Sequence, residues 1–91
     1  MTALLLAITG HVQGVGYRDW MTAQARRRGV SGWVRNRADG TVEALVHGEA
    51  DAIADLVRIC RRGPPLAAVI GIAETPADPP ATPGFRRLPT A

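Results

Sequence analysis

The sequence predicts an α+β sandwich, in which two helices cover one face of an antiparallel sheet of four or five strands. Two segments with helical spacing interrupt a series of short apolar runs, in the order strand, helix, strand, strand, helix, strand. The chain has 91 residues, of which 46% are hydrophobic, enough for one small core. Neither an internal repeat nor a change of composition divides it. We therefore expect a single domain over residues 1–91.

The first strand and the first helix follow from residues 3–29. Apolar residues occupy both parities of residues 3–8, which is typical of a central strand, although periodicity alone does not separate such a run from a buried helix. Tyr17, Trp20 and Met21 then fall at helical spacing, and Gly29 is a suitable helix end. The arginine triplet at 26–28 is expected to be a solvated helix end rather than a binding patch.

The middle of the chain predicts a hairpin and a second helix. Strand-like runs, Val30 to Arg37 and Thr41 to His47, flank the turn Ala38-Asp39-Gly40, and Asp-Gly is a strong hairpin signal. Residues 49–62 show the clearest helical pattern, and Gly63-Pro64-Pro65 ends it. Its apolar stripe, which should face the core, is formed by Ile53, Leu56, Val57 and Cys60. Cys60 is therefore expected to be an inert packing residue.

The C-terminal part adds one strand and a possible second. Residues 66–73 are rich in Ala, Val and Ile, while residues 76–83 contain four prolines and should be irregular. Residues 85–88 could form a short edge strand. Two split β-α-β units give the βαββαβ order of a ferredoxin-like sandwich, with a four- or five-stranded antiparallel sheet and both helices on one face. Because this fold hosts many functions, it does not identify one.

Composition limits the class of ligand and the cellular location that we expect. All 11 basic residues are arginine, against 8 acidic residues, and the net charge of +3 suits either nucleic acid or phosphorylated metabolites. A single cysteine excludes an internal disulfide and fits a reducing cytoplasm. The N-terminal apolar run is too short to span a bilayer, and it lacks a basic leader. We therefore expect a cytoplasmic protein with no membrane partner.

The most informative stretch is the loop between the first strand and the first helix. Residues 10–18 read Gly-His-Val-Gln-Gly-Val-Gly-Tyr-Arg. Gly14 and Gly16 allow left-handed backbone that turns N–H groups inward, and a helix start adds free N–H groups and a positive dipole end. Arg18, in the first helical turn, carries a guanidinium suited to two phosphate oxygens. The stretch indicates a pocket for a tetrahedral oxyanion, although such loops often only make a tight turn.

Comparison with other phosphate loops limits the chemistry. The stretch lacks the Gly-Lys-Ser/Thr ending of a nucleotide P-loop and the third glycine of a dinucleotide fingerprint. It also lacks the cysteine nucleophile of a covalent phosphatase. His11 and His47 are expected to be ordinary strand residues near the surface, because no ligand cluster surrounds them in the sequence and no metal site is indicated. The attacking group is then most simply water.

Asn36 is the second polar residue that stands out. It lies near the end of the strand-like run Val30 to Arg37, where asparagine is depleted, and Asp39 and Gly40 already supply the turn. One interpretation is a strand-end side chain that bonds to local backbone. The other is a carboxamide that orients a water molecule, since it both donates and accepts. The sequence leaves both open.

Two blocks together resemble the acylphosphatase family: residues 10–18 above, and residues 32–43, Gly-Trp-Val-Arg-Asn-Arg-Ala-Asp-Gly-Thr-Val-Glu. Residues 63–65 with Ala68-Val69 resemble a third, weaker segment, so the match covers residues 4–75. Tyr17 stands where phenylalanine is usual, which adds a hydroxyl near the loop. The tail at 85–88 replaces a more regular apolar strand, which puts the order of the last strand in doubt.

The resemblance implies a fold, an activity and a set of site residues. It implies the ferredoxin-like fold and hydrolysis of carboxyl-phosphate mixed anhydrides to carboxylate and inorganic phosphate, without a metal or other cofactor. Asn36 would position the attacking water, and Arg18 would act with it in catalysis. The phosphate-binding residues would be Gln13, Gly14, Val15, Gly16, Tyr17 and Arg18. The partner would be a small acyl phosphate, and we expect a monomer.

Two rival functions remain at this stage. The same fold can stack nucleic-acid bases on an open sheet face, and the chain is basic. Against this, the chain has only four aromatic residues, and its arginines cluster at helix ends without an RNP-type segment, so we expect no nucleic-acid partner. The other rival is a regulatory domain that binds phosphate without turnover.

Overall fold

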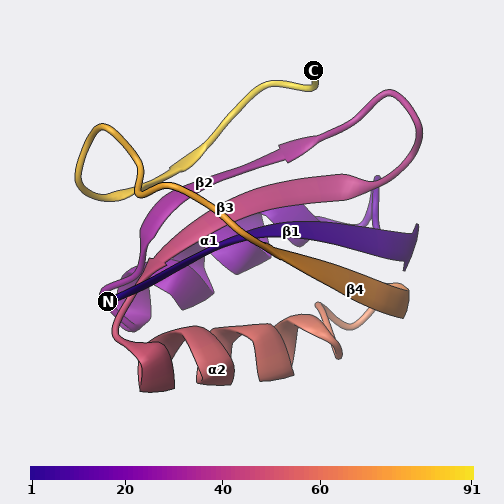
Figure 1. Cartoon of the computed structure of the whole chain (residues 1–91). Helices are drawn as coiled ribbons and strands as arrows, with labels where there is room; N and C mark the ends of the chain where they lie inside the picture. Colours follow the sequence, from indigo (N-terminus) through magenta and orange to yellow (C-terminus); the bar gives the residue numbers. More distant parts are fainter.

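Seven elements follow one another in the predicted order in the computed structural model, which describes residues 1–91 (Figure 1). They are β1 (Thr2–His11), α1 (Tyr17–Arg27), β2 (Ser31–Asn36), β3 (Val42–Gly48), α2 (Ala50–Cys60), β4 (Ala68–Pro76) and β5 (Phe85–Arg87). The two helices lie against one face of the five-stranded sheet (Figure 1). The predicted α+β sandwich is therefore confirmed.

The strands of the sheet follow the order β4-β1-β3-β2-β5, so β1 lies inside the sheet. β1 pairs antiparallel with β3 on one side and with β4 on the other. β1 therefore has a hydrogen-bonded neighbour on each side, and the prediction of a central strand is confirmed. β2 and β3 form the expected hairpin, in which Asn36 pairs with Val42 across the turn at 37–41.

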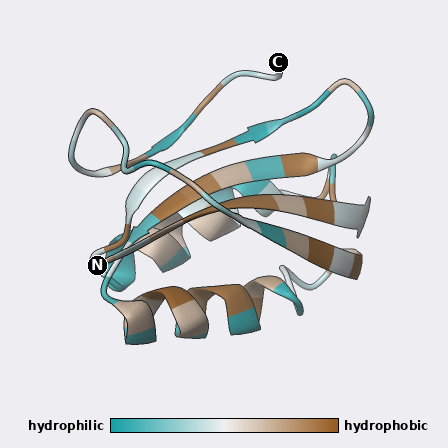
Figure 2. Cartoon of the chain, in the orientation of Figure 1, coloured by the Kyte–Doolittle hydropathy of each residue, from teal (hydrophilic) through white to brown (hydrophobic).

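The core lies between the sheet and the helices. Leu6 and Ile8 of β1 point into it, as do alternate residues of β2 and β3. The apolar side of α2 faces the sheet (Figure 2), and the four residues of its predicted stripe are buried. Burial raises the pKa of the Cys60 thiol to about 11, so the thiol is neutral and only packs, as expected.

The last strand departs from the prediction. β5 pairs with β2 in parallel, so the sheet is mixed rather than wholly antiparallel. The reason is the crossing between the two sheet edges. β4 ends beside Leu4, at the end of the sheet where β2 begins, and the chain crosses there to reach the opposite edge (Figure 1). Because β5 then enters the sheet at the end where β2 begins, it runs in the same direction as β2 and pairs with it in parallel.

The arginine triplet at 26–28 is less free than expected. Arg26 donates through Nε and Nη2 to the carbonyl oxygen of Phe85, at 3.1 and 3.0 Å, and so ties α1 to β5. Arg28 forms an ion pair with Asp55 of α2 at 2.7 Å. Two of the three arginines therefore connect elements. Neither helix has the length and apolar content that a membrane crossing requires.

Candidate active site

The loop between β1 and α1 adopts the backbone that its glycines allow. Gly14 and Gly16 have φ of 74° and 78°, in the left-handed region that other residues rarely enter. Gly16 precedes the first residue of α1, and no side chain caps this helix end. The first intrahelical bond runs from the Trp20 N–H to the Gly16 carbonyl oxygen, so the earlier N–H groups of the helix have no intrahelical partner. Such a helix start offers free N–H donors and the positive end of the helix dipole to an anion.

A small cavity of about 130 Å³ opens at this helix start. It gathers residues from four parts of the chain: the end of β1 and its loop, the first turn of α1, the end of β2, and β5. Its lining is formed by Val12, Gly14, Gly16, Tyr17, Arg18, Asp19, Asn36 and Arg87. A cavity of this size accommodates a tetrahedral anion rather than a large ligand. Arg18 and Asn36, which the sequence singled out separately, lie in one site.

Arg18 is held in this cavity by the C-terminal segment. Its Nη1 donates to the carbonyl oxygen of Leu88 at 3.1 Å, and the side chain is half-buried. No carboxylate pairs with it, whereas several other arginines of the chain form ion pairs. A guanidinium has five N–H donors, and only one of them is used here. The side chain is therefore positioned and still has donors for an oxyanion.

Asn36 lines the same cavity from the end of β2. Its main-chain carbonyl oxygen accepts a hydrogen bond from the Ala91 N–H at 2.9 Å, which anchors the backbone. Its carboxamide makes no hydrogen bond within the chain. A strand-end asparagine that only satisfied local backbone would show such a bond. The structure therefore does not show the local backbone bond of the first interpretation, and the carboxamide is free to contact a molecule in the cavity.

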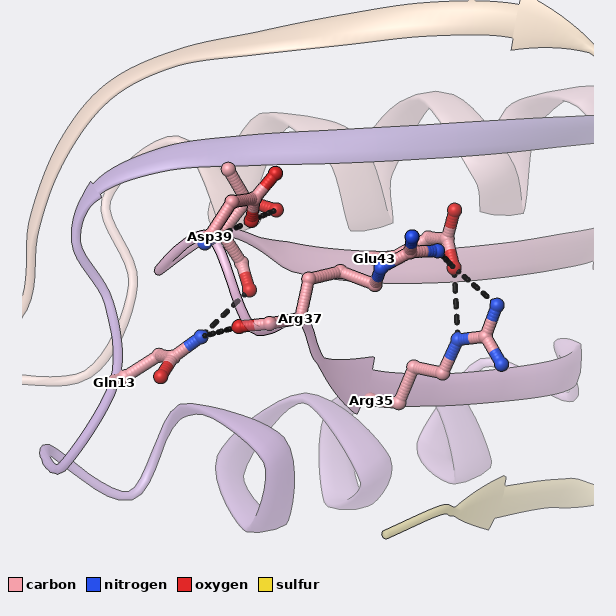
Figure 3. A network of polar contacts seen from close by, with 6 residues as sticks. Gln13, Arg35, Arg37, Asp39 and Glu43 are labelled. Atoms are coloured by element: carbon pink, nitrogen blue, oxygen red, sulfur yellow. Dashed lines mark hydrogen bonds and ion pairs between the residues drawn. The ribbon is translucent and has the colours of Figure 1, made fainter. Parts of the chain in front are cut away.

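Of the six residues predicted to bind phosphate, four line the cavity and two do not. Gly14, Gly16, Tyr17 and Arg18 line the cavity, whereas Gln13 and Val15 do not. Val15 packs against the core. Gln13 turns its side chain toward the β2–β3 turn (Figure 3).

The Tyr17 hydroxyl also lies elsewhere than the sequence suggested. It points away from the loop and donates to the carbonyl oxygen of Cys60, at the end of α2, at 2.7 Å. Burial raises the pKa of Tyr17 far above its usual value, so the phenol stays neutral. The hydroxyl is therefore a link between the loop and α2.

Two charged residues of the cavity were missed by the sequence reasoning. Arg87 reaches the cavity from β5, and its Nε lies 3.0 Å from the Asp19 Oδ1. Asp19 has a local signal, because it follows Arg18 in the first turn of α1. Arg87 has none, because only the parallel pairing of β5 with β2 brings it to the end of the sheet where the cavity lies. The cavity lining thus carries two guanidinium groups and one carboxylate.

Other expected features can be placed as well. His11 and His47 lie on strands, exposed and half-buried respectively, as predicted. No three His, Cys, Asp or Glu side chains come together in a group that could hold a metal ion.

Comparison with known proteins agrees with this geometry. The family model for acylphosphatase matches residues 4–87. The chain is 61% identical to an acylphosphatase from Acidiphilium cryptum over 90 residues, and 50% identical to one from Rhodospirillum rubrum over 90 residues. Each alignment covers 99% of both chains.

A solved structure shows the same fold. The crystal structure of acylphosphatase from Bacillus subtilis superposes with a TM-score of 0.91 and 32% identity, over 97% of this chain and 99% of that one. The glycine loop after β1, the cavity beside it and these relatives agree with one another. The chain belongs to the acylphosphatase family, the hydrolases that cleave acyl phosphates to a carboxylate and phosphate.

Proposed function

We propose that this enzyme holds the phosphoryl group with the loop amides of residues 13–18 and with Arg18, while Asn36 positions the attacking water. The observation that carries this division is the cavity that both side chains line, with the Arg18 guanidinium unpaired by any carboxylate and the Asn36 carboxamide unbonded. The Arg18 guanidinium is a cation, and the helix start carries a partial positive charge and free N–H donors, so both suit phosphate oxygens. A neutral carboxamide suits water.

The reaction needs little more than this. The water oxygen bonds to phosphorus as the bond from phosphorus to the acyl oxygen breaks, and the carboxylate leaves with the electron pair. Phosphoryl transfer depends mainly on positioning and on charge stabilisation. Holding water and phosphate in line supplies up to about 7–11 kcal/mol. One preorganised donor to an oxyanion adds roughly 2.7–4 kcal/mol.

The proton of the water is assigned to a phosphoryl oxygen of the substrate. Two titratable groups besides the arginines line the cavity, and both are engaged elsewhere. Tyr17 donates to the Cys60 carbonyl oxygen, and Asp19 pairs with Arg87. We further propose that no metal ion takes part, which predicts the same rate of benzoyl phosphate hydrolysis with and without a chelator.

The division of roles is tested with two variants and a control. Arg18→Ala should lower kcat/KM for benzoyl phosphate by at least about a hundredfold, the effect of losing one oxyanion contact. Asn36→Ala should lower kcat while the inhibition constant of inorganic phosphate stays unchanged, because the side chain contacts water and not phosphate. Arg27→Ala, the same charge change in the last turn of α1 and outside the cavity, should retain activity. The role of Asn36 is wrong if its variant only weakens phosphate inhibition.

We also propose that one acylphosphatase domain, residues 1–91, acts as a cytoplasmic monomer. The cavity draws on the loop after β1 and on β5 near the other end of the chain, so the site needs the whole fold and is built within one chain. Sedimentation equilibrium should give the mass of one chain, 9.7 kDa. A dimer at assay concentration would contradict the monomer.

A further inference from the structure

The two halves of the proposed site lie on strands that are not neighbours. The phosphate loop follows β1, and Asn36 ends β2, but β3 lies between these strands in the sheet. The sheet hydrogen bonds therefore do not join the loop directly to Asn36. A water held by Asn36 reacts only if its distance and direction to the phosphate are correct. A direct contact between the two halves adds control over this spacing to that of the sheet.

Gln13 supplies such a contact. Its Nε2 donates to the carbonyl oxygens of Arg37 and Thr41, both at 2.8 Å (Figure 3). Arg37 directly follows Asn36, and Thr41 is the residue that the Arg37 N–H bonds across the turn, also at 2.8 Å. The Gln13 side chain thus binds both sides of the β2–β3 turn, next to Asn36, the last residue of β2.

The chemistry of this contact is specific to a carboxamide. The amino group of Gln13 has two hydrogens, and each carbonyl oxygen takes one of them. The bonds are partly buried and span 24 and 28 residues in sequence, so they connect distant parts of the chain. The turn itself is exposed over 38–40. Two hydrogen bonds from Thr41 to Asp39 brace it locally, and the Ala38 N–H donates to the carbonyl oxygen of Ala91 at 3.1 Å. Gln13 is the side chain that fastens this turn to the phosphate loop.

We propose that Gln13 is a positioning residue, whose carboxamide sets the spacing between Asn36 and the phosphate loop. The proposal rests on the roles given above to Asn36 and to the loop. In this proposal the Gln13 side chain does not contact the phosphate, and Gln13 is not among the residues that line the cavity. It predicts that loss of the carboxamide disturbs the water and leaves the phosphate cradle intact.

The test is Gln13→Met, which keeps the length of the side chain and removes both donors. We expect kcat for benzoyl phosphate to fall by about ten- to a hundredfold, the range that a misplacement near 1 Å produces. The inhibition constant of inorganic phosphate should not change. Thr9→Val is the matched control, because the Thr9 hydroxyl makes a similar bond from β1 to the Gly71 carbonyl oxygen, away from the cavity. It should change neither constant.

A double variant separates this inference from the assigned role of Asn36. If Gln13 acts through Asn36, then Gln13→Met should slow the Asn36→Ala enzyme little further. A full additional loss, unchanged kcat, or weaker phosphate inhibition would overturn the role of Gln13 alone. An Asn36→Ala enzyme with normal kcat would instead overturn the role of Asn36. If circular dichroism shows that Gln13→Met does not fold, Gln13→Asn replaces it, because the shorter carboxamide does not reach both carbonyl oxygens. This variant must then show the same fall in kcat with an unchanged inhibition constant.

Discussion

Tyr17 shows how much one side chain can do at the boundary between site and core. Its ring is buried and lines the cavity at the start of α1, and it lies against the ring of Trp20 at a centroid distance of 5.4 Å. Its hydroxyl crosses to the end of α2, where it donates to the Cys60 carbonyl oxygen. A residue that the family resemblance placed among the phosphate-binding residues therefore also joins the first and second helices.

At the residue scale, Tyr17→Phe should lower the free energy of unfolding by about 1–3 kcal/mol, because the Cys60 carbonyl oxygen loses its buried donor. Urea unfolding followed by circular dichroism measures the change. Thr9→Val removes an exposed hydroxyl bond and should cost clearly less. Equal stability of the Tyr17→Phe and parent proteins would show that this hydrogen bond contributes nothing.

At the scale of an element, β5 contributes more than its three residues suggest. Phe85 is buried, which anchors the strand against the core, and Arg26 binds the Phe85 carbonyl oxygen. This anchoring brings Arg87 to the cavity and places the Leu88 carbonyl oxygen against Arg18. The strand whose order was in doubt from the sequence is thus a wall of the site.

β5 itself carries a matched pair for a test. Arg87→Ala should weaken inhibition by inorganic phosphate about two- to fivefold, the effect of losing one half-exposed ionic contact. Arg86→Ala makes the same charge change at the next residue, which is exposed and outside the cavity, and should have no effect. Equal effects of the two variants would mean that only net charge matters. Competition assays with benzoyl phosphate give both inhibition constants.

At the scale of the whole molecule, ion pairs between elements make stability depend on pH. Asp55 of α2 accepts hydrogen bonds from Arg58 and Arg28, and these lower the pKa of its carboxyl group below 3.8. A carboxyl group whose pKa is lower in the folded state stabilises the fold above its unfolded pKa. That contribution is lost as the pH falls through the folded pKa.

Asp55→Asn should therefore weaken the pH dependence of stability in acid. The parent protein should lose stability below about pH 4, and the variant should lose less over the same range while being less stable at neutral pH. Thermal unfolding from pH 2 to 7 measures both slopes. Asp78→Asn removes a carboxylate that forms no ion pair, and it should follow the parent curve. Parallel curves for Asp55→Asn and the parent would refute the linkage.

Local patterns in the sequence determined most of the fold and the central part of the site. The order of the elements, the hairpin at 38–40 and the buried stripe of α2 each follow from spacing within a few residues. The loop with Gly14 and Gly16 and the place of Arg18 in the first turn of α1 are equally local. These features were predictable because neighbouring residues alone create them.

Only the tertiary structure decided what lies around that centre. The parallel pairing of β5, the reach of Arg87 into the cavity and the direction of the Gln13 carboxamide all depend on segments that are far apart in sequence. Periodicity records which face of an element is buried, but it does not record which distant backbone carbonyl a side chain will meet. That choice is made when the sheet assembles and places the loop, the turn and the end of the last strand at one end of the sheet.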